Sequence, residues 1–186
     1  VRAVRGVIPL EIQIHVFGFS RFNGIHELIQ AGANSIDSAS MLRKAWLGAN
    51  LNYLTPDGWY AAIRIPQADK SPRPKRLVNE GVISESKLHK LETICLKEVR
   101  AFAENRVDPT NHLISHLVEY DTLVAGERKG TEERIRRTLD DRPWEKCGCA
   151  ICEQSGIEVV LFRGNNRNRR RGFHNTHIFH QLMQDI

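Results

Sequence analysis

Three of the chain's four cysteines fall within six residues: Cys147, Cys149 and Cys152. Thiolates are anionic and polarisable, and one imidazole can complete the tetrahedron of ligands that Zn²⁺ prefers. His174, His177 and His180 all follow the cluster, and we favour His174 because it stands closest to the intervening loop. The pattern predicts a structural zinc site, because four protein ligands leave no coordination position for water.

The cysteine cluster has a second interpretation, as three buried or reactive thiols beside unrelated histidines. A C-x-C-x-x-C cluster is awkward to pair within itself as disulfides, which makes zinc in a reducing cytoplasm the better interpretation. Metal binding would contribute on the order of 10 kcal/mol to holding this region folded. The fourth cysteine, Cys95, lies on the apolar face of an expected helix and is expected to be a core residue.

Asp37 follows a short expected strand, between Ile36 and Ser38. A carboxylate there could act as a nucleophile, a general base or a metal ligand, or could simply cap a helix. From the residues alone, the capping role is preferred.

Five arginines occupy nine residues without an intervening acid: Arg163, Arg167, Arg169, Arg170 and Arg171. Guanidinium groups match phosphate oxygens, and neighbouring glycine and asparagine residues suggest a loop. The segment therefore predicts a loop that contacts a nucleic-acid backbone. A solvated charged loop without a partner is the alternative.

The N-terminal third predicts alternating strands and short helices: a strand over 10–17, a helix from about Asn23 that ends near Gly32, a strand over 35–38, and a helix that Ser40 caps and Gly48 ends. Short loops between such elements are typical of a parallel sheet. In such sheets the working residues lie at the C-terminal ends of strands. Phe17, Gly18 and Asp37 occupy those ends.

The remaining chain divides at composition changes into the following expected elements: a strand over 59–65, a basic, proline-rich loop over 66–76, a helix over 84–104 that Asp108 and Pro109 end, helices near 113–118 and 131–139, a strand over 157–162, and a helix from about Asn175. We therefore divide the chain into residues 1–65, a helical insertion over 66–143 and a zinc-binding subdomain over 144–186 with a basic loop.

The overall composition is that of an ordinary soluble globular protein, with 41% hydrophobic and 26% charged residues. The order of the expected strands and helices predicts an α/β fold class. The net charge of +5 permits an acidic partner. Neither a membrane-spanning apolar run nor a secretory signal is apparent, so we expect a cytoplasmic protein without a membrane partner. The chain begins with Val1 close to an expected strand, and we expect it to be the C-terminal portion of something longer.

Several motifs occur in an order that resembles the tRNA-guanine transglycosylase family: Phe17-Gly18, residues 32–38 with Asp37, Arg43, Thr55-Pro56-Asp57-Gly58 before Ile63-Arg64, the cysteine cluster with His174-Asn175, and residues 181–183. The resemblance covers residues 10–65 and 144–186. The cysteine cluster is its one specific motif, and the joint order of the others adds to it.

The resemblance implies the C-terminal part of a (β/α)₈ TIM barrel, with a zinc subdomain, in a pentosyltransferase that exchanges guanine for a 7-deazaguanine. Asp37 matches the nucleophile that forms a covalent glycosyl intermediate. Phe17 and Gly18 match the base-binding position, and Arg43 matches a residue near the nucleic-acid backbone. Cys147, Cys149, Cys152 and His174 match the zinc ligands. The first half of the barrel, with a second catalytic aspartate, is absent, so this chain alone should be incomplete as an enzyme.

The departures from the family pattern, chiefly the insertion and the arginine segment, resemble the DNA-directed, DpdA-like branch. DNA is therefore favoured over tRNA as the partner. Two alternatives stay open. One is a non-catalytic, zinc-stabilised nucleic-acid-binding module, or a subunit that joins an N-terminal half-barrel chain in a split enzyme. The other is a tRNA-guanine transglycosylase with an unusual insertion.

Overall fold

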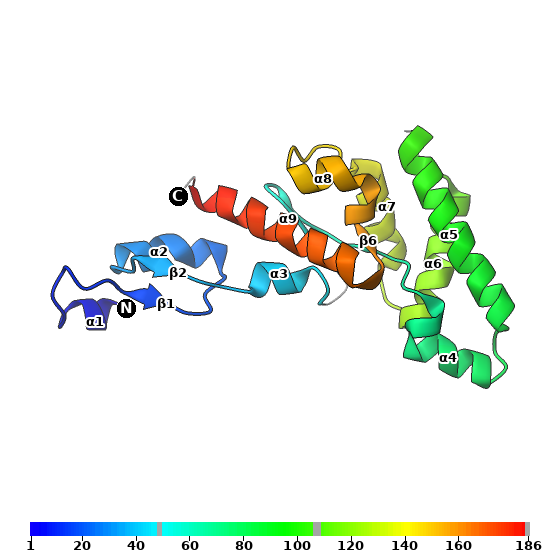
Figure 1. The fold of residues 1–186 in the computed structure, drawn as a ribbon, viewed down its shortest axis with the longest axis horizontal. Coiled ribbons are helices and arrows are strands. Elements are labelled where there is room, and N and C mark those ends of the chain that lie inside the picture. The colour runs from blue at the N-terminus through cyan, green and yellow to red at the C-terminus, as the bar shows by residue number, and fades with distance from the viewer. Residues whose placement is uncertain (48–49, 106–108, 185–186) are drawn as a thin grey trace.

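A computed structural model describes residues 1–47, 50–105 and 109–184. Figure 1 shows an elongated molecule in which residues 1–36 lie at one end and residues 72–125 at the other, with α3 (Ser40–Lys44) near the middle beside the long helix α9 (Gly164–Gln184). Helix α9 extends from the middle toward the N-terminal end. The expected helix ends at Gly48 and Asp108 lie outside the described residues.

The N-terminal part of the chain consists of short elements: α1 (Arg2–Arg5), β1 (His15–Val16), the 3₁₀ helix η1 (Phe22–Gly24), α2 (Ile25–Gln30), β2 (Ser35–Ile36) and α3 (Ser40–Lys44). Strands β1 and β2 pair in parallel, as the strand-helix-strand order predicted. Gly32 adopts φ +94 after the end of α2, a conformation that favours glycine and ends the helix there.

The middle of the chain forms a hairpin and a second parallel pair: β3 (Tyr53–Thr55), β4 (Gly58–Tyr60), β5 (Ile63–Arg64) and β6 (Leu161–Phe162). Strands β3 and β4 are antiparallel, whereas β5 pairs in parallel with β6. All residues between β5 and β6 therefore form one long crossover connection between two adjacent strands.

That crossover is mostly helical: η2 (Ala68–Lys70), α4 (Pro72–Asn79), α5 (Glu85–Asn105), α6 (Asn111–Ala125), α7 (Thr131–Asp141), α8 (Ala150–Ser155) and η3 (Gly156–Val159). Helix α5 buries the apolar face that its spacing predicted, with Leu88, Leu91, Cys95, Val99 and Phe102. These side chains share one core with β5, β6, α6 and α8. The mixed α/β class is confirmed.

Three predicted strands are shorter than expected. Of residues 35–38, only Ser35 and Ile36 form β2. Of residues 10–17, only His15 and Val16 form a strand, because β1 is hydrogen-bonded to β2 over that length alone. The predicted strand 59–65 is divided into β4 and β5, which pair with different partners. The alternation of apolar and polar residues thus identified extended segments of the chain, but it could not predict how many of their residues pair with another strand.

Two further predictions were wrong about the type of element. Residues 66–76 are not a loop, because α4 begins at Pro72, and proline is compatible with the first turn of a helix. Residues 157–159 belong to the 3₁₀ helix η3, and only residues 161–162 form a strand, β6. Their β-branched side chains are buried by the surrounding helices, so tertiary packing decides the conformation.

The arginine segment is also helical rather than a loop, because α9 begins at Gly164 and not near Asn175. Arginine is a good helix former, so a continuous helix is compatible with the sequence. Ser40 does not cap α3, since Ala39 is the N-cap residue, and Ser38 Oγ accepts from the Ser40 amide at 3.1 Å.

Candidate functional site

Four ligand atoms converge where α8 and α9 meet the β3–β4 hairpin. The Cys147, Cys149 and Cys152 sulfurs and a ring nitrogen of His174 lie within 4.8 Å of one another. His174 Nδ1 is 3.7 Å from Cys147 Sγ and 3.4 Å from the other two sulfurs. Cys149 is also the N-cap residue of α8, so one short turn presents all three thiols.

The orientation of His174 is set by contacts outside the cluster. Its Nε2 lies 2.8 Å from the Leu54 carbonyl, so Nε2 carries the proton and Nδ1 is free to bind a metal. The Tyr53 ring stacks on the imidazole at 4.0 Å, and the Tyr53 hydroxyl lies 3.1 Å from Cys152 Sγ. Burial raises the pKa of the Tyr53 phenol, which therefore stays protonated and can donate to that sulfur.

The thiols cannot all ionise without a cation among them. A hydrogen bond with Cys152 lowers the pKa of Cys147 to about 3, and the same contact raises the pKa of Cys152. Burial raises the pKa of Cys149. A divalent ion would supply the positive charge that the second and third thiolates require, and three sulfurs with one nitrogen suit Zn²⁺. The residues therefore fit zinc.

Neither alternative histidine takes part in the cluster, because His177 and His180 are exposed on α9. Cys95 is buried in the core as expected, and burial raises the pKa of its thiol to about 12.

Asn175 fastens the same helix to the rest of the chain. It is fully buried and accepts from the Leu54 amide, while its Nδ2 donates to the Met41 and Asn52 carbonyls. In the sequence, Asn175 attracted attention only because it follows His174, and its hydrogen bonds were not predicted. No signal in the sequence pointed to Tyr53, whose role depends on a contact between residues about 120 positions apart in the chain.

Asp37, Phe17 and Gly18 come together at the C-terminal ends of β1 and β2. Asp37 Oδ1 accepts from the Gly18 amide at 2.8 Å, and the carboxylate is exposed. Asp37 is not a helix cap, because α3 begins after Ala39. His15 Nε2 lies 3.9 Å from the same oxygen, and Phe17 contacts the His15 ring and is 80% exposed. Arg43 is exposed on α3.

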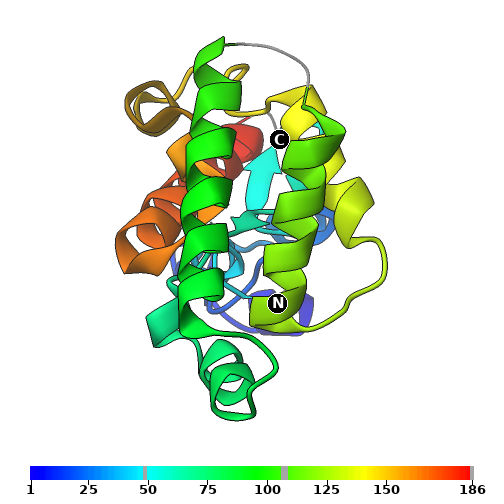
Figure 2. The same cartoon turned by 90° about the vertical axis from the view of Figure 1, so that its right-hand side faces the viewer.

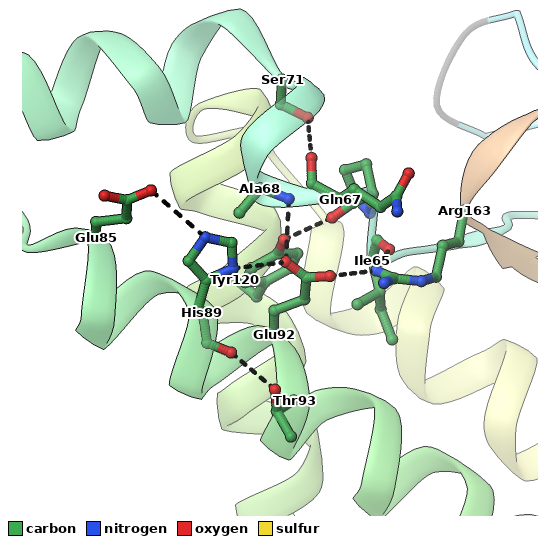
Figure 3. A network of polar contacts seen from close by, with 11 residues as sticks. Ile65, Gln67, Ala68, Ser71, Glu85, His89, Glu92, Thr93, Tyr120 and Arg163 are labelled. Atoms are coloured by element: carbon green, nitrogen blue, oxygen red, sulfur yellow. Dashed lines mark hydrogen bonds and ion pairs between the residues drawn. The ribbon is translucent and has the colours of Figure 1, made fainter.

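Four of the five arginines of the basic segment divide into paired and exposed side chains. Arg163 reaches Glu92 of α5 at 2.5 Å, in the network that Figure 3 shows. Arg167 pairs with Glu158 of η3. Arg169 and Arg170 are exposed.

Arg171 is fully buried. Its guanidinium donates to the carbonyls of Ala45, Val159 and Leu161 and to Asn168 Oδ1. Burial lowers its pKa to about 9, which leaves it charged at neutral pH. The prediction of a phosphate contact for Arg171 conflicts with this placement, because its donors are occupied by the protein and no surface is available to a ligand.

These features define a mixed α/β protein with a buried Cys₃His centre that fits zinc. No protein-family model matches the chain. The chain is 36% identical over 186 residues to a protein of Salmonella montevideo named DNA-guanine transglycosylase. This relative confirms the resemblance to the transglycosylase superfamily and to its DNA-directed branch.

The alignment covers 97% of this chain and 44% of the relative, so the chain spans less than half of the relative's length. Among the described residues, no helix is both long and apolar enough to cross a membrane.

Proposed function

We propose that this chain is the C-terminal portion of a transglycosylase that exchanges guanine for a 7-deazaguanine in DNA. The observation that carries the proposal is the position of Asp37, exposed beside Phe17 and Gly18 at the ends of two parallel strands. The name of the relative and the fit of the Cys₃His centre to zinc support it.

We further propose that β1 and β2 belong to a (β/α)₈ barrel whose remaining strands lie in a part of the protein that this chain does not include. The parallel pairing of β1 and β2 supports this assignment. So does the exposure of apolar side chains in the same region, among them Val7, Leu10 and Phe17. The relative is long enough to contain the additional strands.

In the proposed reaction, the Asp37 carboxylate attacks C1′ of the target nucleotide and the C1′–N9 bond breaks, releasing guanine. The Gly18 amide holds Oδ1, which leaves Oδ2 to act as the nucleophile. Guanine leaves with the electron pair of the C1′–N9 bond and takes up a proton. The incoming 7-deazaguanine gives up its N9 proton, which balances the one that guanine gained, and its N9 then attacks C1′ and frees the carboxylate. Two displacements at one carbon give net retention of configuration. The target must leave its base stack to reach Asp37.

The remaining side chains take supporting roles in this proposal. Phe17 stacks against the flat base, and exposed Arg43, Arg169 and Arg170 contact the DNA backbone. Arg163 and Arg167 are already paired with glutamates, which makes them weaker candidates. Zinc takes no part in the chemistry, and its ligands hold α9 against the hairpin.

The test is trapping of a covalent protein–DNA adduct by the complete protein. Asp37→Asn should abolish the adduct, because an amide oxygen is a poor nucleophile. Asp57→Asn is the matched control, since Asp57 is an exposed carboxylate at the turn of the hairpin. Survival of the adduct in the Asp37 variant would refute the proposal.

The same assay separates the alternatives. Binding of DNA by this chain with no exchange after the remaining protein is added would indicate a non-catalytic module. Adduct formation with tRNA but not with DNA would indicate a tRNA-directed enzyme.

A further inference from the structure

Three side chains with metal-binding atoms converge outside the Cys₃His centre, on the helical pair α5 and α6. Figure 2 shows these two helices side by side. Glu98 projects from α5, and His112 and His116 project from α6. Their ligand atoms all lie within 4.8 Å of one another.

Helix geometry explains why the two histidines face the same carboxylate. Residues four apart lie on one face of a helix, so His112 and His116 both reach toward α5. Their rings meet edge to face with centroids 4.1 Å apart. His116 Nδ1 lies 2.8 Å from Glu98 Oε2, and His112 Nε2 lies 3.8 Å from Oε1. Small rotamer changes would bring all three groups to one ion.

The donor set selects the kind of ion. Two imidazoles and one carboxylate suit Zn²⁺, Co²⁺ or Ni²⁺, whereas Ca²⁺ and Mg²⁺ prefer oxygen ligands alone. The two histidines differ in exposure: the side chain of His112 is 74% exposed, whereas that of His116 is 20% exposed. An ion can therefore enter from solvent and keep water in its remaining positions.

We propose that Glu98, His112 and His116 form a second metal site, which takes one divalent transition-metal ion and cross-links α5 to α6. It differs from the Cys₃His centre in having no thiolate and in leaving coordination positions open. The proposal does not depend on the transglycosylase function.

The test is a calorimetric titration of the chain with Zn²⁺ after one equivalent of zinc has filled the Cys₃His centre. One further ion should bind per chain. Glu98→Gln should weaken this binding by more than tenfold, because it removes the anionic ligand while preserving side-chain size. The double variant His112→Ala/His116→Ala should abolish it. The double variant His177→Ala/His180→Ala, which removes two exposed histidines of α9, should bind as the parent does.

Cobalt provides a second measurement that identifies the ligands. Co²⁺ added to the zinc-loaded chain should produce weak d–d absorption without thiolate charge-transfer bands. The proposal is overturned if no further ion binds, if binding persists in the His112/His116 double variant, or if the second equivalent of Co²⁺ shows thiolate bands. Because Glu98→Gln adds no bulk, its effect remains interpretable if the histidine variant unfolds.

Discussion

At the residue scale, His174 is held on both sides of its imidazole ring. One nitrogen faces three sulfurs, and the other faces the Leu54 carbonyl. The contact with the Leu54 carbonyl orients the ring so that its other nitrogen faces the sulfurs. Such outer contacts typically change metal affinity by about 10- to 100-fold.

Replacing His174 should therefore remove zinc. His174→Ala should lower zinc affinity by more than about 100-fold, because a lost ligand costs more than a lost outer contact. His174→Cys should keep zinc, since it restores four ligands. His177→Ala is the control, because His177 is exposed. Zinc content by mass spectrometry and competition with a chelator measure the effect, and equal loss from His177→Ala would contradict the assignment.

The same substitution should change the free energy of unfolding strongly at Arg171 and hardly at all at Arg169. Arg171→Met leaves three backbone carbonyls without their donor and should lower the free energy of unfolding by about 3–5 kcal/mol. Arg169→Met alters an exposed side chain and should change it by less than about 0.5 kcal/mol. Urea unfolding measures both. A stable Arg171→Met protein would show that these hydrogen bonds contribute little.

At the scale of elements, Glu158 of η3 joins two long helices. It accepts from Arg100 of α5 at 2.7 Å and from Arg167 of α9. Burial raises the pKa of this carboxyl, but the two hydrogen bonds outweigh burial and hold it below its usual 4.5. The ionised carboxylate thus stabilises the fold above that pH, and the contribution is lost as pH falls through the lowered pKa.

Glu158→Gln should therefore lower the free energy of unfolding by about 1 kcal/mol at pH 7, since the group is partly exposed. The difference from the parent should disappear as the pH falls well below 4.5. Glu153→Gln is the control, because Glu153 is exposed on α8. Thermal unfolding across that pH range checks the prediction, and a difference that persists in acid would refute the ionic cause.

Helices α5, α6 and α7 and the members of the Cys₃His cluster were predictable from sequence, whereas the lengths of the strands, helix α4 and the conformation of the arginine segment were not. Helix α5 buries the apolar face that its helical spacing predicted. The three cysteine side chains and that of His174 lie together, as the sequence predicted. Strand lengths depend on pairing between distant segments, as in β5 with β6. Arg171 is buried because it donates to carbonyls at the C-terminal end of α3, in η3 and in β6. The residues next to Arg171 in the sequence cannot predict these contacts.

At the scale of the whole molecule, the two ends differ in how completely they are packed. One core unites the β5–β6 pair with the crossover helices. Toward the N-terminus, Val7, Leu10 and Phe17 are each at least 80% exposed, and β1 pairs with β2 over two residues. A two-stranded sheet is marginal by itself. The proposed barrel accounts for this difference, because its remaining strands would cover the exposed side chains.

Hydrogen exchange should reveal this difference. In this chain alone, amides of residues 13–37 should exchange much faster than those of α5 and β6. When the chain is joined to the remainder of the proposed longer protein, residues 13–37 should become protected while α5 changes little. Equal protection of both ends in the isolated chain would contradict the prediction that β1 and β2 require additional strands.

Helix α9 carries Arg171, His174 and Asn175 within five residues, and each of them binds a segment much earlier in the chain. A ribosome synthesises α9 after all of these segments. The three cysteines therefore leave the ribosome before the histidine that completes their set. During that interval the nascent chain presents unliganded thiols, so oxidation and premature metal capture compete with correct folding. Synthesis of α9 thus ends this vulnerable period.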